Sequence, residues 1–386
     1  MGTSQSLAPA RPTSRESRLR HFFVGRSLDA RIESGRDNVL QLRLLAALMV
    51  LFGHSYAVLG PTVGAREPLH FLFPGIVTHV TGVNFFFVIS GLLITLSWLR
   101  RPDLLRFLRA RFLRIFPALA ACVTVTAFVI GPMVTTLPLR SYFLEGDASG
   151  TPLGYAFNNA ILNHRAFLPG VFEHLPTARF VNGSLWTLPV EAKMYLGVAG
   201  LGVLRCFRFP WLTSIGIVGA FSYLVLYPAY IGQSPSIAYI QAGFFGAGCI
   251  ACLLRRYVPV SSGIMLAVLA AAVVSRNTTH LMPFTWLAIG YFVLWFCYVP
   301  RIAKVPQDID LSYGTYLWAF PVQQLLVTSG IGDPLALFAL ATPIALMLAF
   351  LSWFYIEKPA LRLKDGRWWP LRLPLRSEAQ APSPTV

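Results

Sequence analysis

Two ionisable side chains within one apolar segment are the strongest indication of chemistry in this sequence. Arg43 and His54 stand in a run long enough to cross a membrane, where a central arginine costs roughly 2.5–3.5 kcal/mol. Their separation is close to three helical turns, so both side chains project from one helix face, about 16 Å apart along the axis. We therefore predict that they line an internal passage. Snorkelling of Arg43 and an interhelical hydrogen bond of His54 are the simpler alternatives.

A carboxylate is also expected at membrane depth. Glu191 lies in NGSLWTLPVEAKMY, residues 182–195, directly after the helix-loosening Pro189. Ionisable residues within membrane segments are functional by default. A salt bridge between helices, for example with Arg43, is the structural alternative.

A basic cluster precedes the third apolar run. Its arginines are Arg106, Arg109, Arg111 and Arg114, followed by Pro117. Taken singly, each fits the usual excess of positive charge in cytoplasmic loops. Together they form a site for a polyanion, because arginine binds phosphates through two parallel hydrogen bonds. A nucleotide-bearing cosubstrate such as coenzyme A would fit.

The elements that must position these groups follow from composition. The chain has 386 residues, 55% hydrophobic and 12% charged, with a mean hydropathy of +0.60. Soluble domains are about a quarter charged, and the apolar blocks here have the length of about twenty residues that crosses a bilayer. We predict an all-α polytopic membrane helix bundle of about ten transmembrane helices, at residues 38–60, 76–98, 113–136, 185–204, 211–230, 237–254, 261–275, 282–300, 311–330 and 334–356.

The net charge of +16 follows the loops of this topology. With both termini in the cytoplasm, the predicted inner segments hold 25 of the 32 lysines and arginines. This distribution is the positive-inside rule. The basicity therefore indicates topology and contact with lipid headgroups, and it argues against nucleic acid as a partner.

The remaining segments are short. Residues 1–37 are polar and basic and lack the apolar core of a signal peptide, so we expect a disordered cytoplasmic tail. The transmembrane domain is predicted at 38–364, with an outer loop at 137–184 that contains a short helix at 153–163. Residues 365–386 form a second cytoplasmic tail. The five cysteines lie within or beside spans, so we expect neither a disulfide framework nor a metal site.

Several motifs carry a family resemblance when they are taken in order. They are the ten residues between Arg43 and His54, GVNFFFVISGLLI at 82–94, RFLRIFP at 111–117, GSLWTLPVEAKMY at 183–195, SYGTYLWAFPV at 312–322 and FYIEKPALRL at 354–363. This ordered set resembles the acyltransferase 3 family of integral membrane O-acyltransferases. Two positions depart from the pattern. Ala319 stands where members often have histidine, and Asn84 stands where an acidic residue is common.

The resemblance implies transfer of an acyl group, usually acetyl, from acyl-coenzyme A to a hydroxyl of a carbohydrate or other glycosylated acceptor. Acyl-CoA is then a cosubstrate, and no bound cofactor is expected. His54 would be the general base. Arg43 would guide the pantetheine arm or stabilise the oxyanion, and Glu191 would orient His54 or the sugar. Direct attack and an acyl-histidine intermediate both stay open.

The expected setting is the bacterial inner membrane, with the donor in the cytoplasm and a lipid-linked glycan outside. Trp186, Tyr313 and Tyr316 can stack on sugar rings, although interhelical packing is the commoner use of such residues. A transporter or flippase of a lipid-linked sugar is the rival interpretation, since it too needs charges at membrane depth. A non-catalytic assembly partner is a third, which the presence of Arg43, His54 and Glu191 disfavours.

Overall fold

The computed structural model describes residues 25–148, 150–177, 179–230, 236–302 and 309–365. Within these ranges the chain is a helical bundle with one short antiparallel ribbon, in which β1 (Arg26–Ser27) pairs with β2 (Pro259–Val260). The predicted all-α class is confirmed.

The long helices are α3 (Val39–Ala57), α6 (Thr78–Arg100), α7 (Leu104–Val125), α10 (Thr187–Val203), α11 (Pro210–Tyr230), α12 (Ile237–Leu253), α13 (Ser262–Val274), α14 (Leu281–Tyr298), α15 (Ser312–Thr328) and α16 (Pro334–Ser352). The short helices are α2 (Leu28–Glu33), α4 (Pro61–Gly64), α5 (Pro68–Leu72), α8 (Gly131–Val134), α9 (Pro152–Ala160) and α17 (Lys358–Arg362). Segments of π-helix at Thr126–Ile130 and Trp353–Glu357 join α7 to α8 and α16 to α17, and a third stands at Ser141–Glu145. Single 3₁₀ turns occupy Cys206–Arg208, Ser275–Asn277 and Leu363–Asp365.

Each of the predicted spans overlaps one of the long helices. Among the described residues, six helical stretches are long and apolar enough to cross a bilayer: Val39–Ala57, Thr78–Arg100, Leu104–Val134, Pro210–Pro228, Leu281–Tyr298 and Pro334–Arg362. The helices α10, α12, α13 and α15 are shorter, at 13 to 17 residues. The chain is thus a multi-pass membrane protein, and the count of ten spans stays a prediction.

The third span begins earlier than expected. Helix α7 starts at Leu104 rather than near residue 113, because the side chain of Asp103 accepts a hydrogen bond from the backbone N–H of Arg106 (2.9 Å) and caps the helix. The basic cluster therefore lies on the first three turns of a helix. Consequently its arginines point in different directions from the helix axis.

Residues 26–33 form β1 and α2 instead of continuing the expected disordered tail. Leu28 is fully buried in a cluster with Leu92 and Cys252, and Asp29 forms an ion pair with Arg255 at 2.5 Å. A fully buried leucine contributes about 1.5–3 kcal/mol, which explains the order. The rest of the predicted tails, residues 1–24 and 366–386, lies outside the described residues.

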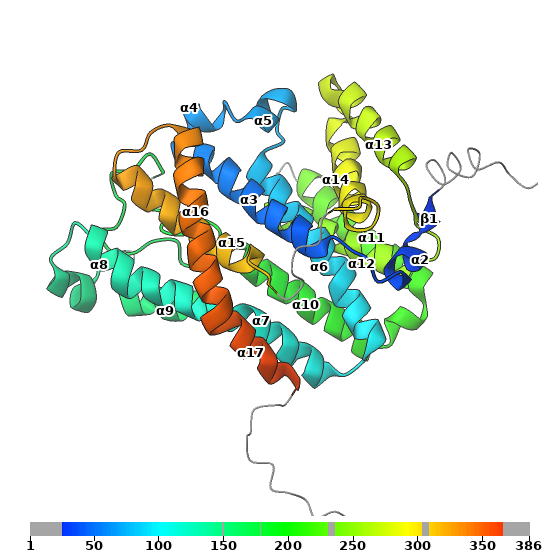
Figure 1. Ribbon diagram of the computed structural model, residues 1–386, viewed down its shortest axis with the longest axis horizontal. Coiled ribbons are helices and arrows are strands. Elements are labelled where there is room, and N and C mark those ends of the chain that lie inside the picture. The colour runs from blue at the N-terminus through cyan, green and yellow to red at the C-terminus, as the bar shows by residue number, and fades with distance from the viewer. Residues whose placement is uncertain (1–24, 149, 178, 231–235, 303–308, 366–386) are drawn as a thin grey trace, which may run out of the picture.

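Helix α6 runs through the middle of the bundle between α3 and α12 (Figure 1). Its contact with α12 is backbone to backbone. A Cβ at Gly91 would lie 2.0 Å from the carbonyl oxygen of Phe245, and one at Gly248 would lie 2.2 Å from that of Val88. Small residues permit this close approach of membrane helices, so α6 is firmly placed against its neighbour.

The long loop before α10 packs onto one end of α3. It contains α9, close to the predicted short helix. The hydroxyl of Thr177 donates toward the carbonyl oxygens of Ala57 (3.1 Å) and Val58 (3.0 Å) at the helix end, and the Ala57 carbonyl also accepts from the backbone N–H of Gly60 (3.1 Å). Gln324 of α15 donates to the carbonyl of Phe180 at 2.7 Å. The loop therefore stabilises the end of α3 that carries His54.

Candidate active site

A cavity of about 340 Å³ opens between α3, α6, α7, α10 and α15. We call it the arginine pocket. Its polar lining consists mainly of Arg43, Ser90, Arg111, Arg114, Thr187, Glu191, Asp310 and Lys364. The structure thus gathers Arg43, Glu191 and half of the predicted basic cluster around one space. Arg106 and Arg109 are exposed and do not line it.

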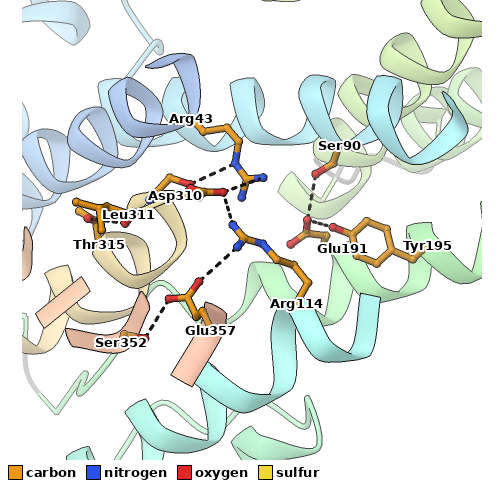
Figure 2. Close-up of polar contacts among 11 residues, drawn as sticks. Arg43, Ser90, Arg114, Glu191, Tyr195, Asp310, Leu311, Thr315, Ser352 and Glu357 are labelled. Atoms are coloured by element: carbon orange, nitrogen blue, oxygen red, sulfur yellow. Dashed lines mark hydrogen bonds and ion pairs between the residues drawn. The ribbon is translucent and has the colours of Figure 1, made fainter. Parts of the chain in front are cut away.

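Four of the charges around this pocket form one network (Figure 2). Asp310 contacts Arg43 at 3.4 Å and Arg114 at 2.7 Å, and Arg114 also reaches Glu357 at 3.4 Å. Asp310 and Glu357 are 8% and 2% exposed. Each charge therefore has an opposite partner, as buried ions require.

Hydroxyl groups complete the same network. Ser312 donates from its hydroxyl to Asp310 at 2.5 Å and accepts from Arg43 at 3.2 Å, and Ser352 donates to Glu357 at 3.0 Å. Burial raises the pKa of Asp310, but the guanidinium groups of Arg114 and Arg43 lower it more, and the net shift is downward. Asp310 is therefore held as a carboxylate.

Arg111 differs from Arg114, which lies one turn further along α7, in its interaction partners. Within the described part of the chain, no carboxylate lies in ion-pair distance of it, and its buried Nε has no hydrogen-bond partner. Its guanidinium lies over the rings of Phe107 (5.8 Å) and Tyr195 (6.0 Å). Arg111 thus brings a positive charge to the pocket that no protein carboxylate neutralises in direct contact.

Glu191 is directed at the same pocket from α10. It accepts hydrogen bonds from Ser90 at 3.1 Å and from the phenol of Tyr195 (Figure 2). The alternative of a salt bridge to Arg43 is not what the structure has, because Arg43 pairs with Asp310. The structure also does not bring Glu191 to His54, whose ring contacts are with other residues.

Of the three aromatic residues predicted to bind the acceptor, two line the arginine pocket and one does not. Tyr313 and Tyr316 line the arginine pocket. Tyr313 donates to the carbonyl of Ile115 at 2.9 Å, and Tyr316 donates to that of Ser184 at 2.8 Å. Trp186 stands at the start of α10 and does not line the pocket. Each tyrosine therefore both links neighbouring segments of the bundle and forms part of the pocket wall.

His54 is 8% exposed and does not line the arginine pocket. Its ring packs against that of His79 of α6 in a tilted arrangement, with centroids 4.9 Å apart, and makes an edge contact with the ring of Phe320 of α15 at 5.2 Å. Phe320 is one turn beyond the pocket-lining Tyr316 on α15. The same helices that wall the pocket therefore continue to His54.

Sequence reasoning missed Asp310, Glu357 and His79. Asp310 stands two residues before the SYGTYLWAFPV motif and Glu357 lies inside FYIEKPALRL, so both were within or beside quoted motifs without a role. Their signal was a carboxylate adjoining an apolar run, which calls for a cationic partner. His79 gave a similar signal, an ionisable residue near the start of a span.

Comparison with known proteins identifies the class. A family model described as an acyltransferase domain, that of the acyltransferase 3 family, matches residues 38–356. With this match and the helical bundle, the chain belongs to the acyltransferase 3 family and is a multi-pass membrane acyltransferase.

Two relatives cover most of the chain. An O-acetyl transferase of Shigella phage Sf6 is 29% identical over 333 residues, 82% of this chain and 93% of the relative. Nodulation protein 10 of Rhizobium leguminosarum bv. viciae is 27% identical over 365 residues, 86% of this chain and 95% of the relative. No solved structure matches the chain.

Proposed function

We propose that the protein is an O-acetyltransferase that moves an acetyl group from acetyl-CoA to a hydroxyl of a carbohydrate or lipid-linked glycan, with His54 as general base. The observation that carries this proposal is Arg111. Its guanidinium has no described carboxylate in ion-pair distance, and it lines a pocket whose helices lead to a buried imidazole. The relative named as an O-acetyl transferase supports acetyl as the group and oxygen as its acceptor.

Donor binding is assigned to the arginine pocket, which would open to the cytoplasm. Arg111 binds an anionic or carbonyl oxygen of the donor, because arginine makes charge-assisted hydrogen bonds that are about twice as strong as neutral ones. Arg43 and Arg114 are engaged by Asp310 and Glu357, so their role is to hold the pocket wall. Tyr313 and Tyr316 belong to this donor side, rather than to the acceptor side where stacking on sugars was expected.

The chemical step is a proton transfer joined to acyl transfer. His54 removes the proton of the acceptor hydroxyl, and the oxygen attacks the thioester carbonyl. The carbon–sulfur bond then breaks, and the thiolate of coenzyme A takes the proton back from His54. A positioned general base typically contributes 10²–10⁴-fold. An acyl-histidine route would instead leave label on the protein when acceptor is absent.

The depth of His54 suits a reaction between two compartments. In the proposed topology the donor enters from the cytoplasm at the Arg43 end, and the acceptor approaches from the outside at the His54 end. The separation of about 16 Å along α3 is roughly half of the hydrocarbon thickness. The proposed location is the bacterial inner membrane.

The test uses the purified full chain in detergent with radiolabelled acetyl-CoA and a sugar acceptor. We expect labelled ester to form with the wild type and not with His54→Ala at equal folded concentration. Equal ester formation by both proteins contradicts His54 as the base. Movement of a lipid-linked sugar across liposomes by the wild type, without ester formation, would instead establish the transporter.

The acceptor can be sought in cells. Surface glycans from strains with and without the gene are compared for O-acetyl groups by mass spectrometry. We expect a mass difference of one acetyl group per modified hydroxyl, which complementation with the wild type restores and His54→Ala does not. Unchanged glycans in every strain would contradict a surface carbohydrate as acceptor.

A further inference from the structure

His54 has a second buried imidazole beside it. The ring of His79, on α6, lies 4.9 Å from that of His54 with 32° between the ring planes. The Nδ1 atom of each histidine is buried, and neither has a hydrogen-bond partner within the described part of the chain. Buried polar atoms are nearly always paired in native proteins, so each exception needs an explanation. Two such exceptions on neighbouring rings point to one shared cause.

The fold brings the two rings together through Gly53. A Cβ at this position would lie 2.5 Å from the backbone nitrogen of His79 and 2.9 Å from its Cβ. Any other residue would therefore push α6 away from α3 at this level. Because Gly53 directly precedes His54, the close approach places His79 against the proposed base.

His79 also stands on the face of α6 that leads to the arginine pocket. From His79, steps of four, three and four residues reach Val83, Phe86 and Ser90, all of which line that pocket. Residues at such spacing share one helix face. The pair of histidines thus lies on the continuation of the pocket wall.

A carboxylate stands behind His79. Glu67 is 2% exposed, and it accepts hydrogen bonds from the backbone N–H and the hydroxyl of Thr78, the residue before His79. Its remaining oxygen accepts from the backbone of His70 at 3.2 Å. This carboxylate acts electrostatically on His79, where it favours positive charge.

We propose that His79 is a positioning residue for His54, an inference that rests on the proposed function. Neutral His54 carries its proton on Nδ1 and takes the acceptor's proton at Nε2. The imidazolium so formed donates its Nδ1–H to the Nδ1 of His79 once the two rings rotate to bring these atoms face to face. This hydrogen bond pairs the Nδ1 atoms of His54 and His79 and fixes the orientation of the His54 ring. It breaks when His54 returns its proton to the coenzyme A thiolate.

Three variants of His79 separate an acceptor role from a packing role. His79→Phe keeps a ring and removes the acceptor, whereas His79→Asn and His79→Gln keep a side-chain oxygen that can accept from Nδ1–H. We expect His79→Phe to lower kcat about 100-fold, the cost of a misdirected reacting group, with an unchanged KM for acetyl-CoA. At least one of the amide variants should recover tenfold or more of that loss.

His164→Phe is the matched control, since His164 also has a buried ring nitrogen without a partner but belongs to the loop before α10. It should keep the kcat of the wild type. Full activity of His79→Phe overturns the proposal, and so does an amide variant series that is uniformly as slow as His79→Phe. If His54→Ala is inactive while His79→Phe is active, only this inference fails. If His54→Ala is active, the proposed function itself fails.

Discussion

The charge network at the Arg43 end of α3 and the histidine pair at its other end differ in how their polar atoms are paired. Near Arg43, each charge of the network has an opposite partner, and hydroxyl groups satisfy further oxygens. Near His54, two neighbouring imidazole nitrogens are buried without any partner. Fully satisfied polar networks rigidify a structure. Buried polar groups without a partner can instead form a hydrogen bond only with a group that is absent from the resting protein. Under the proposed function, the first end has a structural role and the second a chemical one.

Arg111 is the exception that makes the comparison useful. It stands at the network end, yet it has the unsatisfied character of the histidine end. Arg114, three residues away on the same helix, is engaged by two carboxylates. Proximity in the sequence therefore does not give the two arginines the same role. The role of each follows from the groups that its guanidinium contacts.

The largest expected effect comes from His54→Ala. We expect acyl transfer to fall by about 10²–10⁴-fold, the usual contribution of a general base. The melting temperature should fall only modestly, from the lost packing against His79 and Phe320. Initial rates and a thermal scan of the same detergent preparation measure both quantities. A variant that unfolds as well as losing activity would break the comparison, because the histidine end would then be structural too.

For Asp310→Ala we expect a loss of folded protein, in contrast to the loss of activity expected for His54→Ala. Removal of this carboxylate leaves Arg43 and Arg114 without their shared partner, and breaking a buried pair costs about 3–5 kcal/mol. We expect loss of folded protein, measured as the monodisperse fraction in size-exclusion chromatography. Asp310→Asn, which keeps the size and one acceptor, should be less severe. A well-folded but inactive Asp310→Ala protein would place the network in the chemistry.

A low pH should weaken the ion pairs of Asp310 with Arg43 and Arg114 in the wild type. The lowered pKa of Asp310 means that its carboxylate stabilises the fold fully above the ordinary carboxyl pKa of about 3.9. This stability is lost as the pH falls from there through the lowered value. We expect the difference in melting temperature between wild type and Asp310→Asn to shrink on acidification below about pH 4. A difference that grows with acid would show that the ion pair is not its source.

Arg111→Gln and Arg114→Gln should differ although they make the same chemical change. Arg111→Gln should raise KM for acetyl-CoA by about 10–150-fold, the value of 1.5–3 kcal/mol for hydrogen bonds to a charged group, and leave stability unchanged. Arg114→Gln should lower stability, because two buried carboxylates lose their partner. Substrate titrations and thermal scans compare the two. Equal effects of both variants would remove the distinction between the two guanidinium groups.

The smallest expected effect is that of Thr177→Val. This nearly isosteric change removes the hydroxyl that bonds the end of α3. We expect a loss of about 1 kcal/mol in stability and a modest decrease in kcat, since the helix end that carries His54 loosens. Thr328→Val, whose hydroxyl bonds only its own helix at Gln324, is the control. A larger effect from the control would argue against this role of the loop.

The sequence predicted the helices well because apolar length is a local property. The runs around residues 38–60 and 76–98 became α3 and α6 with ends shifted by a few residues. The start of α7 was misplaced, since charge suggested a loop where the cap at Asp103 begins a helix. Order at α2 was missed because it depends on Leu28 meeting residues far along the chain.

The site could be predicted only in its composition. Arg43, Glu191, Arg111 and Arg114 do surround one pocket. Their partners were not predictable, because Asp310 and Arg43 are distant in sequence and meet only through the packing of α15 on α3. The pairing of His54 with His79 depends on the close approach at Gly53, which no local pattern reveals.

The contact of α6 with α12 has a consequence for motion. Where carbonyl oxygens of one helix occupy the space of missing side chains on the other, neither helix can slide or rotate without collision. The two helices therefore move as one rigid body that carries Ser90 and His79 together. Any change in the width of the arginine pocket is therefore expected from the other helices that line it, not from a displacement of α6 relative to α12.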